Sequence, residues 1–122
     1  MRVVYKVVRP TEDPDIYRSA AIHNPLWDVT YQVGQWVSPD FDRSNTLLFC
    51  FGVYEDAKEF RVGDLVIFEA EADGFVMPLR RIGALNPNDM HAFWAGDDDA
   101  RLVLPPTGTL GAQRLKLVRR ID

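Results

Sequence analysis

Hydrophobic and polar residues alternate along several short segments of the chain, a pattern typical of β-strands with one buried face. Residues 2–9 predict such a strand, and we place Val3, Tyr5 and Val7 on its buried face, with Lys6 on the opposite face. Residues 112–121 show the same alternation near the other end of the chain. The two patterns indicate a sheet that brings the ends of the chain into one domain.

Other segments are apolar without a break. Residues 46–52, Thr-Leu-Leu-Phe-Cys-Phe-Gly, predict a strand that is covered on both faces. Residues 65–72 predict a further strand, and Asp73-Gly74 after it has the composition of a hairpin turn. Residues 75–82 are expected to return alongside, with Pro78 directing this segment to a sheet edge or a bulge.

Two segments have helical spacing. In residues 53–60, Val53, Ala57 and Phe60 fall on one face, and acidic residues occupy the first turn, where the helix dipole favours them. Residues 86–96 begin with Asn-Pro, which suits an N-cap and a first helical position. We therefore predict an α+β fold for residues 1–122, a single compact domain with a mainly antiparallel sheet of about six strands and two short helices.

Composition narrows the function classes. The 122 residues are 47% hydrophobic and 26% charged, which is ordinary for a globular domain and excludes disorder and coiled coil. With 14 basic and 18 acidic residues, the formal net charge of −4 predicts no general binding of nucleic acid or anionic lipid. The longest apolar run, residues 47–51, is far shorter than the roughly 20 residues of a membrane-spanning helix. We expect a cytoplasmic protein that does not bind membranes.

Glu69 and Glu71 lie two residues apart on a predicted strand and therefore share a face. Paired carboxylates can divide acid and base roles or hold a ribose hydroxyl. The alternative is that both simply line a solvated face, which is common on half-exposed strands.

The few residues that could bind metal or act as nucleophiles are poorly arranged for either role. His23 and His91 have no ligand-like spacing, and Asp97–Asp99 lacks the glycine and glutamate of a calcium loop. Cys50, the single cysteine, lies within an apolar run where a thiol stays protonated and packs as a small hydrophobe. We predict no metal site and no cofactor.

Aromatic residues outnumber what a small core needs. We predict a binding surface built from Trp27, Trp36 and Trp94 with Arg80 and Arg81, because aromatic and arginine side chains dominate interface energies. The basic residues of this region and of the last strand also have a second interpretation, since they protect exposed strand edges from aggregation.

Several motifs recur in order in a family of small proteins. They are Tyr-Lys-Val-Val-Arg at residues 5–9, Tyr-Gln-Val-Gly-Gln-Trp-Val at 31–37, Glu-Asp-Ala-Lys-Glu-Phe at 55–60 and Ile-Phe-Glu-Ala-Glu at 67–71. In these motifs the chain resembles uncharacterised single-domain proteins of bacteriophages and related prokaryotic elements. That resemblance implies a phage-type protein, located in the cytosol of the host cell if it is phage-encoded, and supplies no established activity.

A second, fainter resemblance is to ADP-ribosyltransferase folds, which begin with an aromatic-basic strand and end on a strand with a catalytic glutamate. Here Arg18, within Tyr17-Arg18-Ser19, and Glu69 or Glu71 would fill those roles, the glutamate orienting the nicotinamide ribose of NAD. The chain departs from that family in lacking its Ser-Thr-Ser element.

Three functions follow as hypotheses. The first is a non-catalytic interaction protein that binds a host or phage macromolecule, with another protein as its partner. The alternative is an NAD-dependent ADP-ribosyltransferase-like enzyme using a strand glutamate. The third is a minor structural component of a virion.

Overall fold

The computed structural model describes residues 2–20, 29–38, 47–79, 82–83, 102–103 and 107–121, with the backbone alone at 82–83 and 102–103. Within these residues the chain is mostly β-strand. The elements, in chain order, are β1 (Arg2–Pro10), β2 (Ile16–Ser19), β3 (Thr30–Gln32), β4 (Trp36–Val37), β5 (Leu48–Phe51), α1 (Tyr54–Phe60), β6 (Val66–Pro78), β7 (Ile82–Gly83), β8 (Leu102–Val103) and β9 (Thr109–Arg120).

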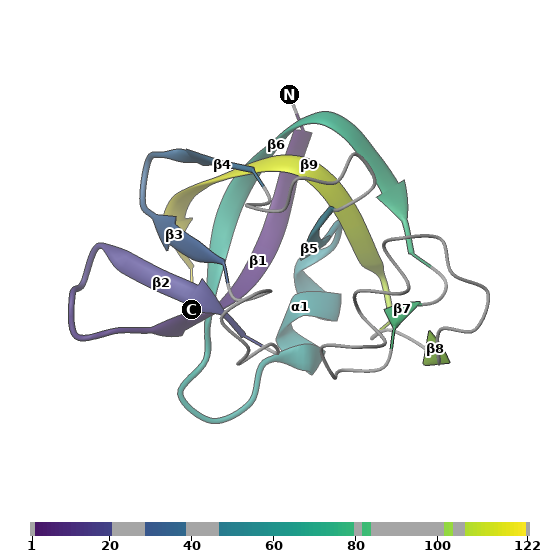
Figure 1. The fold of residues 1–122 in the computed structure, drawn as a ribbon. Coiled ribbons are helices and arrows are strands. Elements are labelled where there is room, and N and C mark those ends of the chain that lie inside the picture. Colours follow the sequence, from purple (N-terminus) through teal and green to yellow (C-terminus); the bar gives the residue numbers. More distant parts are fainter. Residues whose placement is uncertain are drawn as a thin grey trace.

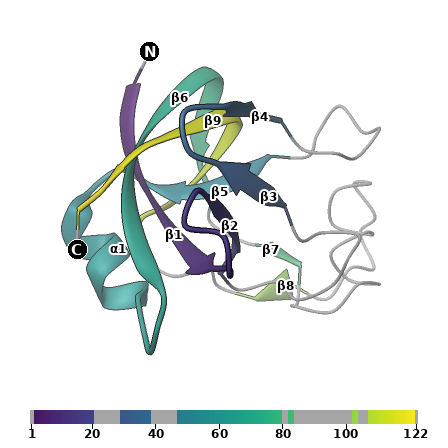
Figure 2. The same ribbon diagram turned by 90° about the vertical axis from the view of Figure 1, so that its left-hand side faces the viewer.

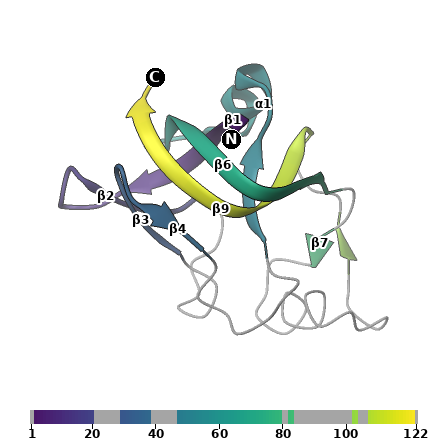
Figure 3. The same ribbon diagram turned by 90° about the horizontal axis from the view of Figure 1, so that it is seen from above.

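Four of the strands close into a barrel. β1 pairs with β6, β6 with β9, β9 with β5, and β5 with β1, all antiparallel. Strands β2, β3 and β4 extend this ring, because β2 pairs with β1, β3 with β2, and β4 with β9. Figure 1 shows the ring with its long strands β6 and β9, and Figure 3 shows it from above. β7 and β8 form a separate two-stranded ladder.

The predicted α+β fold, a mainly antiparallel sheet of about six strands with two short helices, is therefore wrong. The sheet closes because β6 and β9 are long and carry register shifts, between Glu69 and Ala70 and again between Asp73 and Val76. Bulges of this kind bend a strand and increase its twist, which curls a sheet into a barrel. Among the described residues the one helix is α1, and the predicted helix at 86–96 lies outside them.

The predicted hairpin at Asp73-Gly74 is also wrong, because β6 runs through it as a single strand. Asp73 lies opposite Arg114 and Val76 opposite Ala112, so Gly74 and Phe75 together face the single residue Gln113. Gly74 has a positive φ of 76°, which suits a bulge as well as it suits a hairpin turn. The composition of the dipeptide therefore indicated a special backbone conformation, but not which one.

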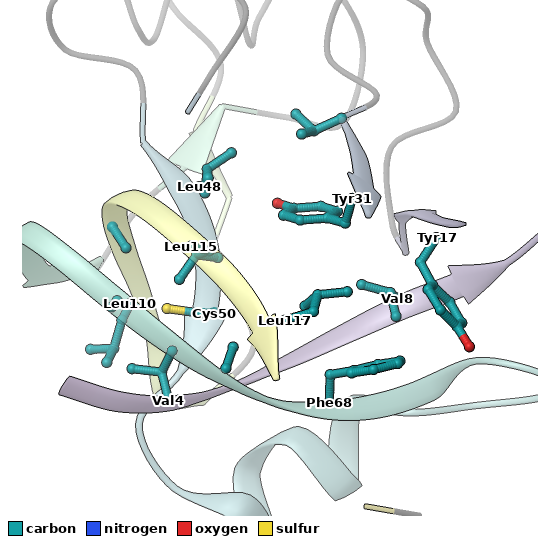
Figure 4. Close-up of a cluster of buried hydrophobic side chains, with 14 of the residues drawn as sticks. Val4, Val8, Tyr17, Tyr31, Leu48, Cys50, Phe68, Leu110, Leu115 and Leu117 are labelled. Carbon is teal, nitrogen blue, oxygen red and sulfur yellow. The ribbon is translucent and has the colours of Figure 1, made fainter. Parts of the chain in front are cut away.

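The main core fills the barrel (Figure 4). Most of its buried side chains come from the barrel strands and from β2 and β3, and they include Val4, Val8, Tyr17, Tyr31, Leu48, Phe68, Leu110, Leu115 and Leu117. The inner face of β1 is thus the one that carries Lys6, the reverse of the prediction, and Val3 on the outer face is 53% exposed. Alternation could not identify the inner face, because part of the outer face is covered as well.

That cover is α1, which packs on the outside of the barrel against β1 and β5 (Figure 2). A second buried cluster forms there from Val7, Phe51, Ala57 and Ile67. The helix predicted at residues 53–60 is confirmed as Tyr54–Phe60, although Val53 is its exposed N-cap residue.

Candidate functional site

The outer face of β6 and β9 carries three ion pairs between residues that lie directly opposite each other in the ladder. Arg114 contacts Asp73 at 2.5 Å, Lys116 contacts Glu71 at 3.4 Å, and Arg119 contacts Glu69 at 2.9 Å. Cross-strand pairs of opposite charge stabilise a sheet, although solvent weakens these three because their side chains are partly exposed. This row of charges joins the two longest strands of the barrel.

Glu69 and Glu71 share the outer face of β6, as the sequence predicts, but each carboxylate faces a cation from β9. The pKa of Arg119 is raised, first by its hydrogen bond to Glu69 and second by the negative charge of the same carboxylate. Both glutamates therefore belong to the row of ion pairs that joins β6 to β9.

The structure does not bring Arg18 to either glutamate. Arg18 is exposed on β2 opposite Arg9, whereas Glu69 lies on β6 opposite Tyr5. By strand rise and strand spacing, the Cα atoms of Arg18 and Glu69 are roughly 15 Å apart. Arg119 is the residue that contacts Glu69 through its guanidinium.

Trp36 lies half-buried on β4, at the side of β9. The guanidinium carbon of Arg114 is 4.8 Å from its ring centroid, and the ammonium of Lys116 is 5.0 Å from it. Both cations are within the range of favourable cation–π contact. Of the predicted binding surface, Trp36 is the one member described, since Trp27, Trp94, Arg80 and Arg81 lie outside the described residues.

Phe75 is an aromatic residue that sequence reasoning missed. It is 56% exposed, and its backbone N–H donates a 2.7 Å hydrogen bond to Oε1 of Gln113, which fixes the bulge. Val76 packs against the barrel core, so strand alternation places Phe75 and Met77, 37% exposed, on the outer face. The signal in the sequence was an aromatic residue directly after a glycine inside a strand, which suggests a bulge.

We name this region the β6–β9 outer surface and define it by Trp36, Asp73, Phe75, Met77 and Arg114. Asp73 and Arg114 are opposite each other, Trp36 stacks on Arg114, and Phe75 and Met77 continue along β6 beyond Asp73. The surface combines a paired charge with three large apolar side chains. It has no net charge of its own.

Inside the barrel lies Lys6, only 7% exposed. Its Nζ donates a hydrogen bond to the carbonyl oxygen of Phe49 and lies 5.4 Å from the ring centroid of Tyr31. Burial lowers the pKa of Lys6 to about 8, and the nearby Cys50 opposes that change. Burial also raises the pKa of Cys50 to about 11, so its thiol stays protonated at neutral pH.

Within the described part of the chain, no three His, Cys, Asp or Glu residues are grouped so as to hold a metal ion. His23, His91 and Asp97–Asp99 lie outside it. No helix among the same described residues is long and apolar enough to cross a membrane.

No model of a known protein family matches the chain, and no curated protein or solved structure is similar to it. The fold by itself defines a small antiparallel β-barrel with an outer helix. The resemblances to phage proteins and to ADP-ribosyltransferases stay predictions.

Proposed function

We propose that this protein is a non-catalytic binding domain that recognises another protein, of host or phage origin, through the β6–β9 outer surface. The observation that carries the proposal is Phe75, a large apolar side chain held in solvent on a bulge that Gly74 and Gln113 fix. An exposed aromatic residue on a fixed backbone loses little conformational freedom on binding, which favours affinity.

The residue types of the surface support the same proposal. Phenylalanine, tryptophan, methionine and arginine are enriched at protein interfaces, and tryptophan and arginine are over-represented among residues whose truncation weakens binding most. Here Trp36 and Arg114 stack on each other, so both are held in place before a partner arrives. Because Asp73 neutralises Arg114, we expect recognition to depend on apolar contact and hydrogen bonds more than on charge.

The chain's net charge of −4 supports a protein partner in preference to nucleic acid or an anionic membrane. We place this activity in the cytoplasm. The lone cysteine, whose thiol is buried in the barrel, is compatible with a reducing compartment.

A capture experiment tests the proposal. The wild-type protein and two variants, Phe75→Ala and Val62→Ala, are immobilised and exposed to lysate of the native cell with NAD added. Val62 is the matched control, because it is another exposed apolar side chain, 66% exposed, outside the strands. We expect a stoichiometric partner that wild type and Val62→Ala retain and that Phe75→Ala loses. Equal capture by all three proteins would contradict the proposal.

The intact mass of the captured partner distinguishes the other hypotheses. An unchanged mass supports a binding domain, whereas a gain equal to one ADP-ribose would support the transferase that uses Glu69 or Glu71. Detection of the protein in purified particles would support the virion component.

A further inference from the structure

Among the described residues, the second half of β6 is paired with a strand on one side only, and we call its other side the open edge. β1 begins at Arg2, opposite Ala72, so β6 continues past β1 from Asp73 to Pro78 and pairs there with β9. Figure 1 shows β6 curving over the N-terminal end of β1 and continuing beside β9. Within the ranges that the structure describes, no strand pairs with the other side of this half of β6.

The hydrogen bonds of this segment identify which backbone groups face the open edge. The N–H of Leu79 donates to the carbonyl oxygen of Thr109 on β9 at 3.0 Å. In an antiparallel ladder the backbone groups of successive residues point to opposite sides, and the register from Val76 to Pro78 is regular. Met77 therefore points its N–H and C=O toward β9, and Val76 points both of its groups toward the open edge.

We propose that this edge binds an extended segment of the partner protein by strand addition, with Val76 exchanging both backbone hydrogen bonds. In this mode main-chain hydrogen bonds supply affinity and alternate side chains supply specificity. Phe75 and Met77 flank Val76 on the outer face, where they can pack against apolar side chains at alternate positions of the added strand. The inference rests on the proposed protein-binding function and names its mode.

The charge of the chain favours a partner segment over a second copy of this chain. Pro78 has no N–H and the bulge at Gly74-Phe75 interrupts the strand, so any strand added at this edge pairs over a short stretch centred on Val76. Each copy carries a net charge of −4, which opposes self-association, whereas a neutral or basic segment meets no such repulsion. The occupant we propose is therefore an extended segment with apolar residues at alternate positions and neutral or basic residues between them.

The test uses short capped peptides in which valine alternates with threonine or lysine, titrated into the isotopically labelled protein. We expect one or more peptides to shift the Val76 amide resonance and slow its hydrogen exchange, while the Met77 amide, already bonded to β9, changes little. A Val76 amide that is as protected as that of Met77 in the free protein would overturn the inference, and so would a peptide set without a binder.

Two proline variants separate the inference from the proposed function. Val76→Pro removes the N–H that faces the open edge, and Met77→Pro removes one that faces β9, so we expect the first to fold and the second to be strongly destabilised. Partner capture that Phe75→Ala loses and a folded Val76→Pro keeps would leave the proposed function standing and overturn strand addition. If Val76→Pro does not fold, hydrogen exchange of the Val76 amide in the wild-type protein, with and without peptide, decides whether the edge accepts an added strand. Sedimentation of the free protein as a dimer would instead assign the edge to a second copy.

Discussion

The Nζ atom of Lys6 donates a hydrogen bond to the carbonyl oxygen of Phe49 inside the barrel, at the point where β1 changes its partner strand. β1 pairs with β5 at Tyr5 and with β2 from Val8 onward, so Lys6 lies between the two pairings. The lysine side chain therefore links β1 to β5 where the two strands separate. Its burial is costly, because the charged form of an amine is poorly solvated in a protein interior.

This burial predicts an unusual dependence of stability on pH. The pKa of Lys6 is about 8 in the folded protein and 10.5 in the reference state, so between these values the unfolded chain holds a proton that the folded chain has lost. The free energy of unfolding therefore rises as pH increases from 8 to 10.5, by about 3 kcal/mol at most. Below pH 8 both states hold the proton, and Lys6 contributes no slope.

Cys50 acts in the opposite direction at higher pH. Its pKa is about 11 when folded and 9.0 in the reference state, so between pH 9 and 11 the unfolded thiol loses a proton that the folded thiol keeps, and the free energy of unfolding falls. The Lys6 effect is therefore cleanest from pH 8 to 9. Urea unfolding over this interval should show that the free energy of unfolding rises with pH in the wild type and does not rise in Lys6→Met. Identical pH profiles for the two proteins would contradict the assignment.

Two substitutions at Lys6 separate the destabilising effect of its buried charge from the stabilising effect of its packing. Lys6→Met keeps an unbranched side chain of similar length and removes the buried charge, which is often neutral or stabilising. We expect its free energy of unfolding at neutral pH to equal or exceed that of wild type, and that of Lys6→Ala to fall by about 2 kcal/mol because a cavity is left. Urea denaturation of the three proteins checks this. Equal losses in both variants would show that the hydrogen bond to Phe49 outweighs the cost of the charge.

Local strand signals in the sequence were sufficient to place the main β-segments and α1, but not to close the barrel. The apolar run at residues 46–52 corresponds to β5, and the alternation near the C-terminus corresponds to β9. Closure depends on bulges, and at Gly74 the sequence indicated a positive φ without distinguishing a bulge from a hairpin. The general rule that charged residues are rarely buried favours the outer face for Lys6, and here that rule fails.

The candidate site was predictable only in part. That Glu69 and Glu71 share a face follows from strand alternation, but their partners Arg119 and Lys116 lie some 45 to 50 positions away in the sequence, and only the register pairs them. The excess of aromatic residues indicates Trp36 as part of a binding surface, but its contact with Arg114 likewise depends on pairing between β4 and β9. Phe75 was missed because exposure of an apolar residue within a strand depends on which face the core occupies.

The bulge that presents Phe75 should be sensitive to substitution of its glycine. A Cβ atom at Gly74 would overlap Oε1 of Gln113, the atom that accepts the Phe75 N–H, and the φ of 76° is strained for any other residue. We expect Gly74→Ala to lower the free energy of unfolding by about 2 to 3 kcal/mol. Gly63→Ala is the control, because Gly63 also has a positive φ but has open space around it, so it should cost only about 1 kcal/mol. If Gly74→Ala and Gly63→Ala lower the free energy of unfolding equally in thermal or urea unfolding, the Gln113 contact does not hold the bulge.

The stacking of Arg114 on Trp36 should be measurable as a coupling between β4 and β9. β4 is only two residues long, so its attachment depends on side chains as well as on its backbone ladder. A double-mutant cycle with Trp36→Leu and Arg114→Met, read by urea unfolding, should give a coupling energy of about 0.5 to 1 kcal/mol. Asp73→Asn, which weakens the ion pair of Arg114 but leaves the ring contact, should preserve most of that coupling. If the coupling energy disappears in the Asp73→Asn background, the ion pair with Asp73 is what holds Arg114 beside the ring. Trp36 would then be held by its own packing alone.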